Sequence, residues 1–267
     1  MPQRGSCCLI ALTPLLVHFV STQGTSTASR NVQRDPQAVI VLNRAITAAG
    51  GLSALSAVQD LRASGTIAFN WSDENVSGDV TIKSRGTEQI RLETNLPDGA
   101  RIWIVSNGRR VKKDADGITI IPYRDPSSFA NVPFPFAHLL DAMQDASLSI
   151  SFVGIENRNG ADVNHVRIGT VDASISNAID VAPNPQSFDV FVDTKTSRIQ
   201  SVMTVASARD SLAVLCHREI WYSDYRPLNG VSIPFSIAEL IDGQQTFSLQ
   251  LSQVSFNTGL SDSDFAP

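Results

Sequence analysis

A strict alternation of apolar and polar side chains near the C-terminus constrains the fold more than any other sequence feature. In the segment 243–256, GQQTFSLQLSQVSF, apolar side chains occupy every second position from Phe247 to Leu251, with Ser and Gln between them. Successive side chains of a β-strand point to opposite faces, so this pattern predicts a strand with one apolar face. The alternation then shifts to even positions at Val254. One extra residue near Ser252, as in a β-bulge, would keep the apolar side chains on one face.

Helical spacing is confined to three short segments. The first begins at Asp35-Pro36, which supplies an N-cap residue followed by proline at the first helical position. Gly50-Gly51 ends this helix. Its apolar stripe is predicted to contain Val39, Leu42, Ile46 and Ala49. Two further helices are predicted over 52–61, with Leu52, Leu55 and Val58 on one side, and over 137–146.

Period-two alternation dominates the rest of the chain. It predicts about ten to twelve strands, among them 65–71, 79–85, 88–94 and 100–108, with Asn107-Gly108 as a tight turn. The segment 73–79 is predicted to be a turn, and 124–136 and 172–186 are predicted to be loops. Composition does not change after residue 35, and no internal repeat is visible. The fold class is therefore mainly β, in a single domain over residues 36–267.

Charge and motif content exclude several classes of function. The formal net charge is −5, and the one basic run, 109–113, is interpreted as a solvated hairpin, so no nucleic-acid partner is expected. The histidines are scattered, without metal-ligand spacing. Cys216 and His217 would point to opposite faces of one strand and cannot pair as nucleophile and base. Asp262-Ser263-Asp264 is interpreted as a solvated turn rather than a calcium site. We therefore expect a non-enzymatic protein without metal or cofactor, because no residue set supports hydrolase chemistry.

The N-terminus has the composition of a secretory signal peptide. Arg4 precedes an apolar run from about Cys7 to Val20, which small polar residues follow. Cleavage is predicted after Ala28, with Gly24 as the alternative site. This assigns 1–28 to the signal peptide and 29–35 to a linker, and predicts a periplasmic or secreted protein. Cys216 would then be the single cysteine, so no internal disulfide is expected.

Several segments together resemble LolA-like proteins, the outer-membrane lipoprotein carrier and sorting superfamily. The resemblance lies in the order and spacing of five segments over residues 36–267: AAGGLSALSAVQDLRASGT (48–66), RIWIVSNGRR (101–110), FDVFVDTKTSRIQSV (188–202), YSDYRPLNGVSIPFSIAEL (222–240) and VSFNTGLSDSDFAP (254–267). It implies one strongly curved antiparallel sheet forming a half-open β-barrel. Two or three helices would plug or cap its concave side, with 36–60 and 137–146 as plug and lid.

The resemblance also implies a binding site for an acyl chain in the concavity. Its candidate lining and lid residues are Phe69, Trp71, Ile104, Phe134, Phe136, Leu139, Met143, Phe235, Ile237 and Leu249. The three tryptophans and the phenylalanines are interpreted first as ordinary core, but on a half-open barrel core and pocket merge, since the inner face serves as both. The best-known carriers hold the lid closed with an arginine on an early strand. Arg85 comes nearest to that position, with Arg62, Arg91 and Arg101 as rivals.

Two functions remain open at this point. The first is a binding protein, or carrier, for a lipid, an acyl chain or an acylated protein, served by a membrane-associated donor or acceptor. Burial of an acyl chain of about 16 carbons is worth on the order of 10 kcal/mol before binding costs. The second is a structural or interaction scaffold of the same fold, whose concavity its own helices fill.

Overall fold

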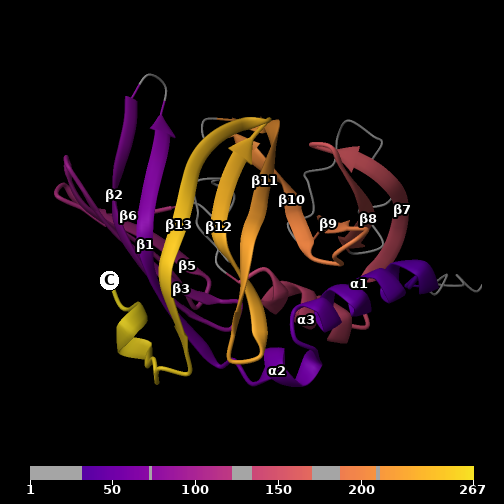
Figure 1. The fold of residues 1–267 in the computed structure, drawn as a ribbon. Helices are drawn as coiled ribbons and strands as arrows, with labels where there is room; N and C mark the ends of the chain where they lie inside the picture. Colours follow the sequence, from indigo (N-terminus) through magenta and orange to yellow (C-terminus); the bar gives the residue numbers. More distant parts are fainter. Residues whose placement is uncertain (1–31, 72–73, 122–133, 170–186, 209–210) are drawn as a thin grey trace, which may run out of the picture. The chain divides into compact units, whose positions relative to one another are not determined.

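The described part of the chain folds around a single antiparallel sheet (Figure 1). The computed structural model describes residues 32–71, 74–121, 134–169, 187–208 and 211–267, all within the compact unit Asn31–Pro267. The sheet has 13 strands in the order β6-β5-β4-β3-β2-β1-β13-β12-β11-β10-β9-β8-β7, so it is curved but not closed. The described residues also contain three α-helices. This confirms the predicted fold class, a mainly β chain with one half-open antiparallel sheet.

The elements have the following bounds. The helices are α1 Pro36–Ala48, α2 Leu52–Ser56 and α3 Phe136–Gln144, and a 3₁₀ helix covers Asp262–Phe265. The strands are β1 Asp60–Trp71, β2 Glu74–Arg85, β3 Gln89–Leu96, β4 Gly99–Ser106, β5 Arg109–Asp114, β6 Gly117–Ile120, β7 Ser149–Arg158, β8 Ala161–Gly169, β9 Phe188–Asp193, β10 Ile199–Ala208, β11 Ser211–Leu228, β12 Val231–Ile241 and β13 Gln244–Phe256.

Strands β1 and β13 pair at the centre of the sheet and contain the predicted β-bulge. Ser64 pairs with Gln253 and Gly65 pairs with Leu251, so Ser252 is the extra residue. Gly65 is required here because a Cβ at this position would lie 2.1 Å from the carbonyl oxygen of Gln250. The bulge keeps the apolar side chains of β13 on the inner face, as the sequence pattern predicted.

Helix α1 covers part of the inner face. Its N-cap is Asp35, whose side chain accepts a hydrogen bond from the backbone N–H of Gln37 at 2.7 Å. Val39 is only half-buried, so its predicted place in the stripe is wrong. The residues that α1 buries are Ala38, Val41, Leu42, Ala45 and Ile46, which lie on a face rotated slightly from the predicted one.

Two sequence predictions about local structure are wrong. The predicted helix 52–61 ends at Ser56, because Asp60 already pairs with Arg85 as the first residue of β1. The predicted turn 73–79 belongs largely to β2. Gly78 suggested a turn, but a Cβ there would lie 2.1 Å from the carbonyl oxygen of Asn95, so this glycine serves close strand packing. The predicted loop 172–186 and most of 124–136 lie outside the described residues.

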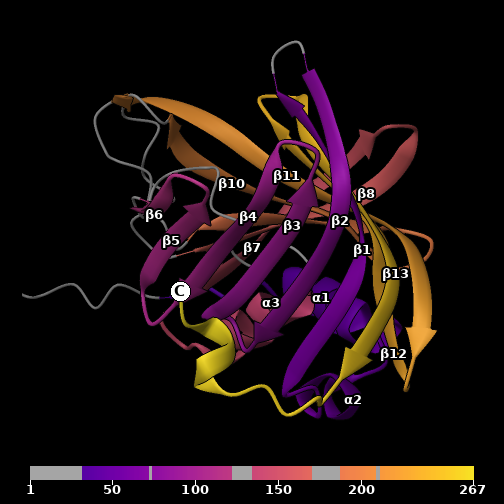
Figure 2. The same cartoon turned by 90° about the vertical axis from the view of Figure 1, so that its left-hand side faces the viewer.

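The C-terminal segment packs on the outer face of the sheet, over β2–β5. Figure 2 shows its 3₁₀ helix in front of these strands, with α1 and α3 behind them. Leu260 and Phe265 pack there in a small apolar cluster. Lys83 forms an ion pair with Asp264 at 2.9 Å. The Asp262-Ser263-Asp264 run is therefore part of an anchored 3₁₀ helix instead of a solvated turn.

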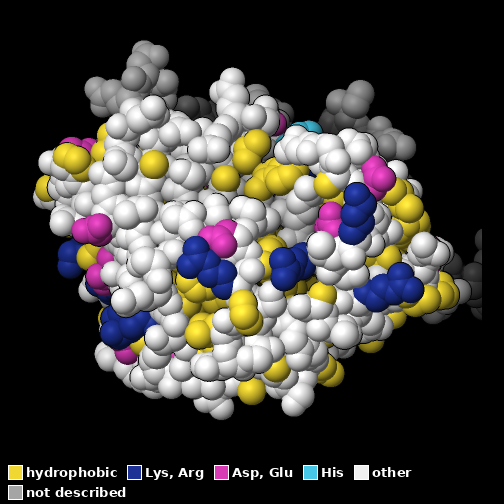
Figure 3. Space-filling view, viewed as in Figure 1, with side chains coloured by type: hydrophobic (Ala, Val, Ile, Leu, Met, Phe, Trp, Pro, Cys, Tyr) yellow, Lys and Arg dark blue, Asp and Glu magenta, His cyan; other side chains and the backbone are white. Residues whose placement is uncertain are grey.

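The described helices and the face shown in Figure 3 give no sign of a membrane-spanning helix or of a basic patch on that face. Within the described ranges, no helix is long and apolar enough to cross a membrane. On the face seen in Figure 3, the Lys and Arg side chains are spaced apart, and several lie beside an Asp or Glu.

Candidate functional site

Most of the predicted lining residues come together on the inner face. Those that belong to the main apolar cluster are Phe69, Phe134, Phe136, Leu139, Phe235, Ile237 and Leu249, and Met143 packs against it. The rings of Phe69 and Phe247 lie 6.2 Å apart, and those of Phe134 and Phe136 lie 6.0 Å apart. Phe69 and Phe247 are 2% and 1% exposed, so both side chains are buried in the apolar cluster of the inner face.

Two predicted lining residues are not part of this set. Ile104 packs with Val111, Leu260 and Phe265 in the separate outer cluster, and its neighbour Trp103 takes the inner position. The sequence pattern could not tell which of Trp103 and Ile104 points inward, because both are apolar. The C-terminal segment covers the outer face of β4, so an apolar side chain is buried on that face as well. The side chain of Trp71 lies outside the described residues.

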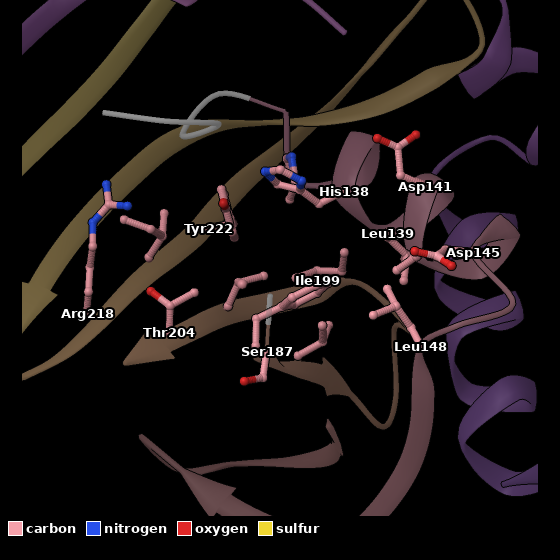
Figure 4. A pocket seen from close by; sticks show the side chains of 16 residues that line it. His138, Leu139, Asp141, Asp145, Leu148, Ser187, Ile199, Thr204, Arg218 and Tyr222 are labelled. Carbon is pink, nitrogen blue, oxygen red and sulfur yellow. The ribbon is translucent and has the colours of Figure 1, made fainter. Parts of the chain in front are cut away.

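An apolar pocket lies between α3 and strands β9–β11 (Figure 4). Its volume is about 370 Å³. Among the predicted residues, Leu139 alone lines it. The apolar lining consists of Pro135, Leu139 and Ala142 on the helix side, Leu148, and Phe188, Val190, Ile199, Val202, Ile220 and Tyr222 on the strands.

Polar groups stand at the margins of this pocket. Figure 4 shows His138, Asp141 and Asp145 on the α3 side and Thr204 and Arg218 at the far end. Hydrogen bonds from the hydroxyl and the backbone N–H of Ser147 hold the pKa of Asp145 below its usual value. Burial raises the pKa of Tyr222 well above that of a free phenol, so its side chain stays neutral. The pocket therefore has an apolar middle and polar ends.

Helix α3, which forms one wall of the pocket, is held by Arg34 and Thr87. Arg34 donates to the carbonyl oxygens of Met143 at 2.8 Å and Ala142 at 3.3 Å, and also to that of Asp145. These carbonyls belong to the last turn, where intrahelical partners are missing and a cation is favoured. The hydroxyl of Thr87 donates to Asp141 at 2.9 Å.

Arg85, the predicted lid-holding residue, contacts a different part of the chain. It donates to the carbonyl oxygen of Leu260 at 3.1 Å, to Gln89 at 2.6 Å and to the carboxylate of Asp262. None of these groups belongs to α3. In the described chain, the arginine that binds α3 is Arg34, which was assigned to a linker from the sequence. Backbone pairing of residues 33–35 with Ile150 positions it.

A second group of ionisable side chains lies on the outer face of β7–β9. His165 is buried, with Nδ1 2.6 Å from Glu156 and Nε2 3.1 Å from Asp189. Burial alone would lower the pKa of His165, but the two carboxylates outweigh it and raise that pKa. Arg167 also pairs with Asp189, at 2.8 Å.

The remaining chemistry-bearing residues do not assemble into a site. Cys216 is buried and His217 is exposed, which confirms that they point to opposite faces. Within the described residues, no group of His, Cys, Asp and Glu has an arrangement that would hold a metal ion.

This chain resembles known proteins in structure but not detectably in sequence. No family model matches the sequence, and no curated protein matches it significantly. A LolA superfamily protein from Nitrosomonas europaea superposes with a TM-score of 0.54 at 11% identity, over 86% of this chain and 97% of that chain. A DUF1329 family protein from Desulfovibrio piger superposes with a TM-score of 0.53 at 11% identity, over the same shares, 86% and 97%. At this identity the likeness concerns the fold alone.

Proposed function

Because the chain has a LolA-like fold, we propose that it is a non-enzymatic binding protein for a lipid, an acyl chain or a lipoprotein. In this proposal residues 1–28 are a cleaved signal peptide, 29–35 a linker and 36–267 the binding domain. The protein then acts in the periplasm or outside the cell. A membrane-associated protein delivers or receives the ligand.

The apolar pocket beneath α3 is the observation that carries this proposal. A volume of about 370 Å³ lies within the range of roughly 300–1,000 Å³ that ligand pockets occupy. Each methylene removed from water contributes about 0.8 kcal/mol, so an apolar chain in this pocket needs no charged anchor. The pocket suits an acyl chain because its middle is lined by aliphatic and aromatic side chains.

Helix α3 is suited to act as a lid because side chains, and not a strand ladder, attach its end. Leu139 and Ala142 face the pocket from the helix side, and the last turn is bound by Arg34. Release of these hydrogen bonds would free the helix end without disturbing the sheet. Of the predicted lining residues, Leu139 is retained as a direct ligand contact, and the buried set on β1, β12 and β13 is assigned to the apolar core.

The scaffold alternative is favoured by the packing on the inner face at β1 and β13, where the rings of Phe69 and Phe247 contact each other and are buried. In that case the pocket beneath α3 would stay empty in solution. The two proposals differ in one observable, the presence of bound lipid.

The test combines lipid analysis with two substitutions. Native mass spectrometry of the purified protein should detect bound lipid, and Leu139→Asp should abolish binding of a neutral hydrophobic dye. Val202→Trp, which fills the pocket floor without burying a charge, should do the same and retain the sheet's circular dichroism. Leu52→Asp is the matched control, because Leu52 is 56% exposed on α2. Absence of lipid together with unchanged dye binding by Val202→Trp would favour the scaffold.

A further inference from the structure

The far end of the pocket is formed by one cross-strand pair. Thr204 on β10 lies directly opposite Arg218 on β11 in the register of the two strands. Figure 4 shows both at the end of the pocket away from α3, beyond the apolar side chains of its middle. A ligand that lies along the pocket with its chain under α3 would therefore place its polar end at this pair.

Arg218 already has its counter-ion. Its Nε donates to the carboxylate of Glu239, and the hydroxyl of Thr246 donates to the other oxygen of that carboxylate at 2.7 Å. The side chains of Arg218 and Glu239 are 11% and 5% exposed. The pair is therefore nearly buried and neutral as a unit.

Arg218 nevertheless keeps one unused donor. Its Nη2 is buried and has no hydrogen-bond partner among the described residues. A buried N–H without an acceptor is unfavourable, so this atom is suited to an acceptor that a ligand brings. The hydroxyl of Thr204, on the neighbouring strand, supplies a second polar group at this end of the pocket.

The charge of the pair decides which acceptor fits. A carboxylate bound at Nη2 would be a second anion beside the buried Glu239, and like charges at short range are disfavoured in a medium of low dielectric constant. A carbonyl oxygen accepts the same hydrogen bonds without that repulsion. The site therefore matches an uncharged acceptor better than an ionised one.

We propose that the Arg218–Thr204 end of the pocket binds the carbonyl oxygen of a neutral fatty acyl ester, with the acyl chain extending beneath α3. This inference rests on the proposed lipid-binding function and names its ligand class. It predicts discrimination against the free fatty acid of the same chain length.

The test measures displacement of the neutral dye N-phenyl-1-naphthylamine by monomyristoylglycerol and by myristate. At about pH 8, where the fatty acid in solution is ionised, the ester should bind about tenfold more tightly, because the carboxylate of the acid would lie beside the negative charge of Glu239. Glu239→Gln leaves the charge of Arg218 unneutralised, so it should reverse the preference in favour of myristate. Arg218→Met combined with Glu239→Gln removes both charges and should abolish the preference while dye binding persists.

The matched control is Arg158→Met combined with Glu219→Gln. This pair, 2.8 Å apart, spans β7 and β11 and does not line the pocket, so its loss should leave the ester preference unchanged. Equal binding of ester and acid by the wild type, or no reversal in a folded Glu239→Gln variant, would overturn the inference and leave lipid binding intact. If neither compound displaces the dye, the proposed function itself fails.

Discussion

The contact between Arg34 and the end of α3 allows a quantitative prediction about the proposed lid. Replacement of Arg34 by Met removes hydrogen bonds to the carbonyl oxygens of Met143 and Ala142 at 2.8 and 3.3 Å, together with one to Asp145. Hydrogen bonds from a charged group contribute about 1.5–3 kcal/mol when buried, and a cation at a helix C-terminus adds up to about 1 kcal/mol. Because the contact is partly exposed, we expect a loss of about 1–3 kcal/mol in the local stability of α3.

Native-state hydrogen exchange measures that local stability. A loss of about 1–3 kcal/mol corresponds to roughly 5- to 150-fold faster exchange of the α3 amides. Amides of β12 and β13 should exchange as in the wild type, because the sheet does not depend on this contact. Release of a bound neutral dye should also be faster.

The control variant is Arg44→Met. Arg44 is exposed on α1, and no hydrogen bond or ion pair links its side chain to the other described residues. If exchange in α3 is equally slow in Arg34→Met and Arg44→Met, Arg34 does not hold the lid. An equal acceleration in every segment would instead mean that Arg34 stabilises the whole fold, which also refutes the reasoning.

Three further predictions concern stability and reactivity. Gly65→Ala should lower the free energy of unfolding, measured by urea titration, by about 3 kcal/mol, because the new Cβ would collide with the backbone of Gln250. The control Gly86→Ala should cost only about 1 kcal/mol, because Gly86 has open space around it and only its φ of 58° disfavours alanine. Asp189 and Glu156 raise the pKa of His165 despite its burial, so the protonated imidazole stabilises the fold fully below about pH 6.5, and this stabilisation is lost as the pH rises through the folded-state pKa. His165→Gln should remove that decline in the free energy of unfolding, measured as a function of pH. A pH profile equal to that of the wild type would contradict the prediction. Cys216 is buried, and burial raises the pKa of its thiol. In protein that lacks residues 1–28, Cys216 should therefore react with a thiol reagent only after unfolding, which an absorbance assay of the released chromophore measures.

The sequence alone predicted the parts of the fold that depend on local alternation. The shift of apolar side chains at Ser252 was enough to predict a bulge, because only one buried face can satisfy the pattern of β13. The same reasoning failed at Ile104, where the C-terminal segment covers the outer face and makes both faces of β4 apolar. A pattern of two apolar faces does not say which one lies inside.

The candidate site was less predictable, because tertiary contacts without a local signal create it. Arg34 reaches the end of α3 only after Gln33 and Asp35 have paired with Ile150 across a large sequence separation. The floor of the pocket uses Val202 and Ile220, which have the same spacing as ordinary core residues of a strand. Which part of an apolar face stays open depends on where the helix lies above it.

The order of strands has a consequence for the folding of this chain. Strand β1 lies at the middle of the finished sheet, yet its partner β13 comes last among the described strands, and their pairing joins Leu61 to Phe256. During translation the early hairpins would carry one long unsatisfied edge until β13 had emerged. Contacts between residues so far apart in sequence form late, so this strand order predicts slow pairing of β1 with β13. Until then the exposed edge of β1 needs protection against aggregation.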